Sequence, residues 1–460
     1  MSATSDRLSR WTPLIFACAL VNLGLGLLLA VLGLAWPVAA PMAPVSLAMV
    51  HLLTIGWVTL LMFGALFQFV PVITSRKLPS QALPLATLIG LEAGLALMVA
   101  GFYDLGRSAL ADRLLPTGGG VVILALLVGA ATLLTPLAAK RPAPLSARLI
   151  IAGLGFLLVT VLLGLTLALA LTVPETAPLL APLLADGVSY HVLSGFGGWF
   201  TLTAIGVSYE LLPMFMLAPH ERGALGESVL WAGVAGFLLA IGAGLASAFS
   251  PAGWIMILEQ AGRLAIVLAV ALYLADVVRL YRGRRRRQIE LHNRAAIGAF
   301  AALGLAVLLA VGAIATDRLA ELAPSLVLLL LLGWLSGLGL TQLYKVVAFL
   351  AWLSRYGAQL GRGPSPRVQD LVNEPRSGGF FILYFAAIAI AAGAAAFDLA
   401  VVVRIALALA LLAVLLLARE YARAWRAYYV SAPPANRRPV APPFLKQKEF
   451  VNDPKRAPHG

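Results

Sequence analysis

The chain has 460 residues, of which 61% are hydrophobic and only 12% are charged, and its mean hydropathy is +0.93. Soluble domains carry about 25% charged residues, so this composition excludes an ordinary soluble protein. The formal net charge is +14, from 34 Lys and Arg against 20 Asp and Glu. The positions of the basic residues along the chain decide what this charge means.

Runs of about 20 apolar residues recur from end to end, and each is long enough to cross a hydrocarbon core of about 30 Å. The first run begins near residue 13 and others follow it, so it is interpreted as a span and not as a cleaved signal peptide. The single cysteine, Cys18, lies in this run, which excludes a disulfide within the chain and a multi-cysteine metal site. The sequence predicts twelve spans, at residues 13–36, 45–73, 83–104, 116–138, 147–172, 187–215, 227–249, 254–280, 295–316, 323–353, 379–397 and 399–421.

The basic residues divide unequally between the two sides of these spans. The tails and the loops on their side hold 28 of the 34 Lys and Arg, whereas the opposite loops hold three, Arg107, Arg113 and Arg318. Basic loops face the cytoplasm, so both termini are predicted to be cytoplasmic. The densest run, RLYRGRRRRQIELHNR at 279–294, is interpreted as a contact to anionic lipid headgroups. No nucleic-acid partner is therefore predicted.

The domain organisation follows from these spans. Residues 1–430 are predicted to form one transmembrane domain. Residues 431–460 are rich in proline and charge, and are expected to be a cytoplasmic tail that is disordered or lies along the membrane surface. The sequence has no phosphate loop, dinucleotide fingerprint, Cys-x-x-Cys motif or nucleophile elbow, which excludes the common soluble enzyme classes.

One motif occurs three times, in the second, sixth and tenth spans. The copies are GWVTLLMFGALFQFVP from residue 56, GWFTLTAIGVSYELLP from residue 198 and GWLSGLGLTQLYKVVA from residue 333. In each copy an aromatic and then a polar residue follow the Gly-Trp pair, and the polar residues are Gln68, Glu210 and Lys345. The tryptophan and the polar residue are eleven positions apart, almost three helical turns, so they are predicted to share a helix face.

The spacing of the copies predicts the architecture. Their starts are 142 and 135 residues apart, which is four spans in each case. The large twelve-span transporter families repeat as six plus six, so this spacing favours another class. The predicted fold is all-α, with twelve transmembrane helices in three four-helix repeats around a pseudo-threefold axis. Gln68, Glu210 and Lys345 should then approach one another on the cytoplasmic side, as a structural clamp with a Glu210–Lys345 ion pair or as a point where protons enter.

The twelve spans, the cytoplasmic termini, the three four-helix units and His51 in the second span resemble the catalytic subunit of haem–copper oxidases. The segments HLLTIGWVTLLMFGALFQFVPV and LYKVVAFLAWLSRYG are similar to bacterial membrane proteins of the oxidase subunit I-like superfamily, which includes haem–copper membrane proteins of the nitric oxide response. The resemblance implies a multi-pass protein of the bacterial inner membrane that binds haem b, with copper as a further cofactor. It also implies another respiratory or membrane subunit as a partner, besides the lipid bilayer.

The histidines limit what this resemblance implies. Oxidases of this type use six histidines around two haems and a copper, whereas this chain has five histidines in total, so oxygen reduction by the usual mechanism is not expected. His51 corresponds to a low-spin haem ligand and His191 to a copper ligand, and Arg404 lies on the side where haem propionates sit in the family. The hypothesis is one shared haem b with an axial nitrogen from each histidine, and with Thr54 and Ser194 as hydrogen-bonding neighbours. The alternatives are a polar contact between helices, a proton relay and a substrate contact.

Other charged residues lie inside the predicted spans. Glu92 sits in the middle of the third span and needs a partner or a proton. Glu259 and Arg263 are four residues apart in the eighth span and can pair along one helix face. Arg404 lies close to the outer end of the last span and can extend to the membrane interface.

Three function classes fit these observations. The predicted one is a haem- or metal-binding integral membrane protein in respiratory electron transfer or nitrogen-oxide handling, which His51, His191 and the resemblance favour. The alternatives are a transporter or channel for a small solute or metal ion, and a cofactor-free oxidase-like scaffold that acts in assembly. Whether the protein is an enzyme stays open at this point.

Overall fold

The computed structural model describes residues 10–176, 180, 187–219, 223–250, 252–357 and 365–426. In these residues the secondary structure is helical and no strand occurs. Eleven helices of the described part are long and apolar enough to cross a membrane. A further helical stretch, residues 187–216, corresponds to the sixth predicted span. The prediction of an all-α, polytopic membrane protein is confirmed, while the predicted tail at 431–460 lies outside the described residues.

The helices follow the predicted spans, with ends that differ by a few residues. The elements are, in chain order, α1 (Thr12–Val31), α2 (Pro44–His51), η2 (Leu52–Thr59), α3 (Leu60–Thr74), α4 (Leu83–Asp104), α5 (Ala111–Ala138), α6 (Leu145–Thr172), η3 (Pro174–Thr176), η4 (Leu193–Thr201), α8 (Leu202–Met216), α9 (Gly223–Phe249), α10 (Gly253–Arg282), α11 (Leu291–Ala315), α12 (Leu319–Val327), η5 (Leu328–Ser336), α13 (Gly337–Tyr356), η7 (Val368–Leu371), α14 (Glu374–Ala395) and α15 (Ala400–Arg426).

The sequence explains why these segments are helices and where several of them begin and end. A backbone inside a bilayer must satisfy its own hydrogen bonds, and a helix does so within one segment. Four helices, α1, α2, α4 and α14, have proline in their first two positions, where no N–H is needed. Two others end on left-handed residues, α3 at Ser75 with φ 56° and α8 at Leu217 with φ 53°.

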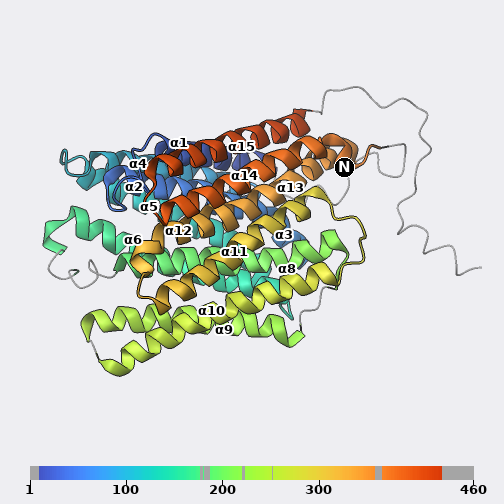
Figure 1. The fold of residues 1–460 in the computed structure, drawn as a ribbon. Coiled ribbons are helices and arrows are strands. Elements are labelled where there is room, and N and C mark those ends of the chain that lie inside the picture. Colours follow the sequence, from blue (N-terminus) through green and yellow to red (C-terminus); the bar gives the residue numbers. More distant parts are fainter. Residues whose placement is uncertain are drawn as a thin grey trace, which may run out of the picture.

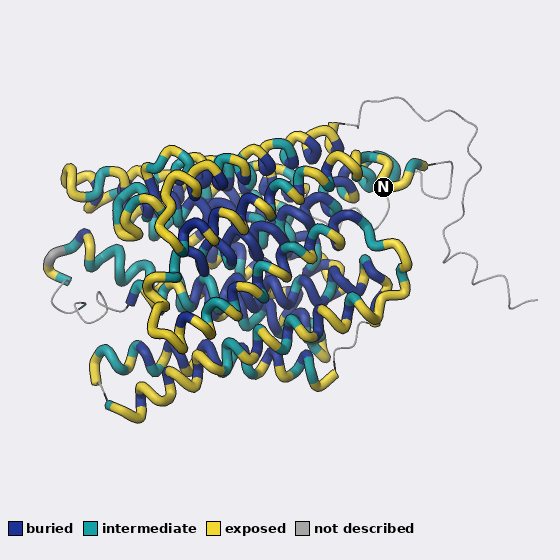
Figure 2. The backbone as a smooth tube through the Cα atoms, viewed as in Figure 1, coloured by how far each residue is buried: buried dark blue, intermediate teal, exposed yellow. Residues whose placement is uncertain are grey.

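The helices lie side by side in one bundle, with α9 and α10 along one edge (Figure 1). The most extensive contacts join α4 with α5, α9 with α10 and α14 with α15. The buried residues are concentrated in the middle of the bundle (Figure 2). The tenth span, Leu319–Tyr356, is 78% buried over its most apolar stretch, against 28% for α10, so it is a central helix.

The second, sixth and tenth spans each contain a π-helical segment, η2, η4 and η5, and each segment carries one Gly-Trp pair. The three tryptophans are at most 1% exposed. The Trp57 indole N–H donates to Ser336 Oγ at 2.8 Å, and that of Trp199 donates to Thr59 Oγ1 at 3.4 Å. The Trp334 indole N–H has no hydrogen-bond partner among the described residues. These bonds join the tenth span to the second and the second to the sixth.

In the second span the tryptophan and the polar residue of the motif have hydrogen-bond partners on different helices. Trp57 contacts Ser336 of the tenth span, whereas Gln68 Nε2 donates to Thr12 Oγ1 of α1 at 2.7 Å. Long side chains on one helix face can reach different neighbouring helices, so the shared face stays a prediction.

Candidate functional site

His51 is the last residue of α2, immediately before the π-helical segment η2. Its Nδ1 lies 2.8 Å from the carbonyl oxygen of Leu47, one helical turn earlier. A carbonyl can only accept, so Nδ1 carries the proton. The ring stacks on Phe102 of α4, with 4.9 Å between ring centroids. The side chain is half-buried, and its orientation is fixed by these two contacts.

His191 lies two residues before the π-helical segment η4. Its Nδ1 donates to the carbonyl oxygen of Thr160 in α6 at 3.0 Å. The carbonyl is accessible because Gly164, one turn further along α6, has no side chain. A Cβ added to Gly164 would lie 3.0 Å from Cε1 of His191. The position of the His191 ring therefore depends on this glycine.

The two imidazoles have the same hydrogen-bonding pattern. Each donates Nδ1–H to a backbone carbonyl, so Nε2 of each ring carries a free lone pair. The predicted neighbours Thr54 and Ser194 are not their partners. Thr54 Oγ1 donates to Val50 O at 2.8 Å, and Ser194 Oγ contacts Thr160 Oγ1 at 3.0 Å. A nearby hydroxyl in a helix bonds most readily to the carbonyl of its own preceding turn.

Gln68, Glu210 and Lys345 do not meet, and the expected Glu210–Lys345 ion pair is wrong. Each instead contacts the preceding span of the chain. Gln68 donates to Thr12 at 2.7 Å, Ser146 Oγ donates to Glu210 Oε2 at 3.1 Å, and Lys345 Nζ donates to Glu290 Oε2 at 2.5 Å. These side chains join the central spans to the starts of α1, α6 and α11, and we call the three contacts clamps.

Of the other charged residues in the spans, Glu92, Glu259, Arg263 and Arg404 each have a polar partner, whereas both carboxylate oxygens of the buried Asp276 have none among the described residues. Asn22 Nδ2 of α1 donates to Glu92 Oε1 at 2.9 Å, which supplies the partner that a mid-span carboxylate needs. Arg263 donates to Glu259, as their spacing predicted. Arg404 Nε donates to the carbonyl oxygen of Val31 at 2.9 Å. Arg404 therefore caps the C-terminal end of α1.

A charged cluster that sequence reasoning missed surrounds Glu290, the residue before α11. The carboxylate accepts hydrogen bonds from Lys345 and Arg286, and His292 Nδ1 lies 3.5 Å from Oε2. Burial alone would raise the pKa of Glu290, but the hydrogen bond and charge of Lys345, together with His292 and Arg286, hold it below its ordinary value. The signal in the sequence was a single acidic residue inside the basic run 279–294.

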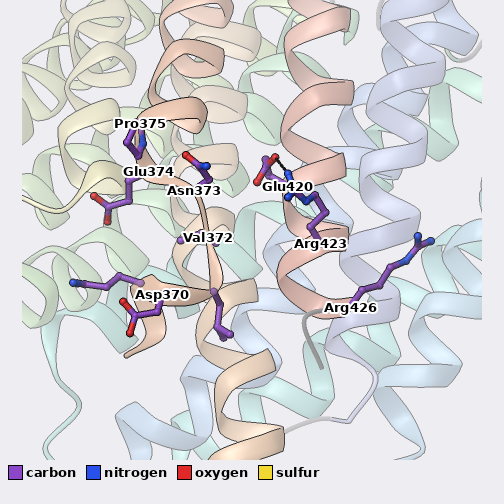
Figure 3. Close-up of a pocket in the computed structure, with 10 residues that line it drawn as sticks. Asp370, Val372, Asn373, Glu374, Pro375, Glu420, Arg423 and Arg426 are labelled. Carbon is purple, nitrogen blue, oxygen red and sulfur yellow. Dashed lines mark hydrogen bonds and ion pairs between the residues drawn. The ribbon is translucent and has the colours of Figure 1, made fainter. Parts of the chain in front are cut away.

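A surface hollow of about 790 Å³ opens where η7, the start of α14 and the end of α15 meet (Figure 3). Its charged lining residues have both signs, and Arg423 Nη1 donates to Glu420 Oε1 at 2.9 Å. α15 begins beside the end of α1, where Arg404 caps it, so its other end lies at the far end of the bundle from His51. The hollow is therefore separate from the two histidines and contains none of the predicted site residues.

No protein-family model matches the chain, and no curated protein matches it. The fold and the apolar helices define a polytopic α-helical membrane protein. Its candidate site is the pair His51 and His191.

Proposed function

We propose that the protein binds a b-type haem through His51 and His191 and acts in respiratory electron transfer or nitrogen-oxide handling. The observation that carries this proposal is that the two imidazoles have the same hydrogen-bonding pattern. Both rings donate Nδ1–H to backbone carbonyls, of Leu47 and Thr160, which leaves each Nε2 as a free ligand atom. Ligand histidines usually donate their other N–H to such an acceptor.

Two imidazoles suit haem better than a bare metal ion. A bare zinc or copper ion takes three or four protein ligands. In the part of the chain that the structure describes, no group of three or more His, Cys, Asp or Glu could hold a metal ion. Haem iron is already held by its macrocycle and takes only axial ligands from the protein. Copper held by the two imidazoles together with ligands from outside the protein is the alternative cofactor.

When bound, the haem would supply one-electron transfer, and the surrounding residues hold its ligands in position. Phe102 fixes the plane of the His51 ring, and the carbonyls of Leu47 and Thr160 hold the Nδ1 protons. Gly164 leaves the space that the His191 ring needs. If His51 and His191 both bound the haem iron, no position would be left for oxygen, so oxygen reduction is not part of the proposal.

The proposal includes a pseudo-threefold arrangement of three four-helix repeats. Three features support it: one π-helical segment in each of the second, sixth and tenth spans, the hydrogen bonds of Trp57 and Trp199 between those spans, and the three clamps to the preceding spans. The Glu210–Lys345 pair is not part of it. The cytoplasmic termini and the bacterial inner membrane belong to the same proposal, as does an association with another membrane subunit.

The optical spectrum of the purified protein, with metal analysis, tests the haem proposal. We expect a Soret band in the wild type, and His51→Ala and His191→Ala should each abolish it or shift it. Gly164→Ala should also change the band, because its methyl group would press on His191. Gly155→Ala on the same helix is the matched control, since a Cβ there meets nothing within 4 Å. His459→Ala is the control for loss of a histidine.

A wild-type protein that is pure and folded but has neither a Soret band nor bound copper would contradict the proposal. The cofactor-free scaffold and the small-solute or metal-ion transporter would then be the remaining classes. A Soret band that survives both histidine substitutions unchanged would mean that another part of the chain holds the haem.

Reporter fusions test the proposed orientation. Fusions at Arg285 and Pro434 should report a cytoplasmic location, because the basic residues are concentrated on that side. A fusion at Arg318, in an opposite loop, should report the periplasm and serves as the control. The reverse pattern would overturn the orientation without affecting the haem proposal.

A further inference from the structure

A narrow cavity of about 90 Å³ lies at the centre of the bundle, between α3, α8 and α13, and we call it the central cavity. Its lining on the second span runs from Val58 to Phe69, so it extends about 16 Å along the helix at 1.5 Å per residue. It begins beside the buried Trp57 and lies deeper in the bundle than His51. The volume is that of about three water molecules, or of one small organic molecule.

The lining of the central cavity is apolar except at three side chains, Thr203, Ser208 and Gln342, and none of the described lining residues is charged. The Ser208 hydroxyl is already engaged, with Tyr273 Oη at 2.7 Å and with the carbonyl of Ile205 at 2.9 Å. The Thr203 hydroxyl also has no hydrogen-bond partner among the described residues, but it faces α6, since a Cβ added to Gly153 would lie 2.3 Å from it. Gln342 is therefore the polar group that the cavity offers to a ligand.

Both amide atoms of Gln342 are buried and have no hydrogen-bond partner among the described residues. A carboxamide has two donor hydrogens and an oxygen that accepts, so a single molecule beside it can be bound by more than one hydrogen bond. Buried polar side chains in proteins nearly always have a partner. The central cavity, which Gln342 lines, has room for a molecule that would be this partner.

We infer that the central cavity binds a small uncharged molecule with an apolar body and one hydrogen-bonding group, which Gln342 recognises. The apolar lining fits the body of such a molecule, and the free amide fits its polar end. A charged ligand would lack a counter-charge there, and burying an unpaired charge is strongly unfavourable. This site is distinct from the two histidines and does not depend on the haem proposal.

Trifluoroethanol at millimolar concentration is a suitable probe, because it has a fluorinated apolar body and one hydroxyl. Fluorine NMR of the detergent-purified full chain should give saturable line broadening. Gln342→Leu keeps the side-chain size but removes the amide, and should weaken binding about tenfold, as loss of one hydrogen bond predicts. Ala204→Leu should abolish binding because it fills the central cavity while Gln342 stays in place.

Gln260→Leu is the matched control, because Gln260 is exposed on α10. This variant should bind the probe as the wild type does. If Gln342→Leu fails to fold, Gln342→Met provides the same test with a more flexible side chain. Broadening that is not saturable, or that is equal in the wild type, Gln342→Leu and Ala204→Leu, would overturn the inference. Ordered water alone at Gln342 in a structure determined with the probe would overturn it too.

Discussion

Replacing Gly262 by valine should destabilise the protein by about 3 kcal/mol, the upper part of the usual range for overpacking. Gly262 of α10 lies directly against the backbone of α9. A Cβ at this position would be 2.4 Å from the nitrogen of Ala240 and 2.8 Å from the carbonyl oxygen of Gly236. Backbone atoms cannot rotate away as side chains can, so the two helices would have to separate. Small residues allow this close packing, which in a membrane is a main source of helix association.

Gly242→Val in α9 is the matched control, because a Cβ there meets nothing within 4 Å. Both substitutions change helix propensity in the same way, so the difference between them reports the contact alone. Unfolding of the two variants in mixed detergent micelles, followed by circular dichroism, gives that difference. Equal midpoints for Gly262→Val and Gly242→Val would contradict the close packing of α9 against α10.

Lys345→Met should also be strongly destabilising, by about 3 kcal/mol, which is typical of breaking one half of a buried ion pair. The Lys345 and Glu290 side chains are only 16% and 14% exposed. Removing the ammonium leaves Glu290 buried with Arg286 and His292 as its remaining polar neighbours. Glu290→Gln should also be destabilising, because it leaves the Lys345 ammonium buried without its carboxylate. The double variant should lose less stability than the two single losses combined, because neither charge is then left unpaired.

Unfolding at low pH provides a second measure of how much the Lys345–Glu290 pair stabilises the protein. Because the folded pKa of Glu290 lies below its ordinary value, the pair contributes its full stability above the unfolded pKa of about 4.3. This contribution is lost as the pH falls through the lower folded pKa. As the pH falls from about 4.3 through the folded pKa of Glu290, the free energy of unfolding should therefore decrease more steeply in the wild type than in Glu290→Gln.

Arg318→Met is the control for loss of a charge, since the Arg318–Glu321 pair is 54% and 51% exposed. Exposed pairs of this kind contribute little, so no measurable change in unfolding is expected. If Lys345→Met were as stable as Arg318→Met, the proposal that the Lys345–Glu290 contact stabilises α13 against the start of α11 would be contradicted.

The sequence by itself determined the class of the protein and the positions of its helices. Hydropathy and the thickness of a bilayer are local criteria, so the spans could be found without knowing which helices are neighbours. The pairing of Glu259 with Arg263 was predictable for the same reason, because residues four apart on one helix are always close. The repeated Gly-Trp pairs also indicated which three spans carry the buried tryptophans.

The partners of polar residues were decided only by the tertiary structure. Lys345 contacts Glu290, and Glu210 accepts from Ser146, so each bonds to the start of the span that precedes its own. The proton acceptor of His191 is a carbonyl of α6, exposed by the missing side chain of Gly164. Arg404 caps a helix 373 residues away in the chain. Such contacts depend on which helices are adjacent and on how each is rotated, and neither property follows from the local pattern of one segment.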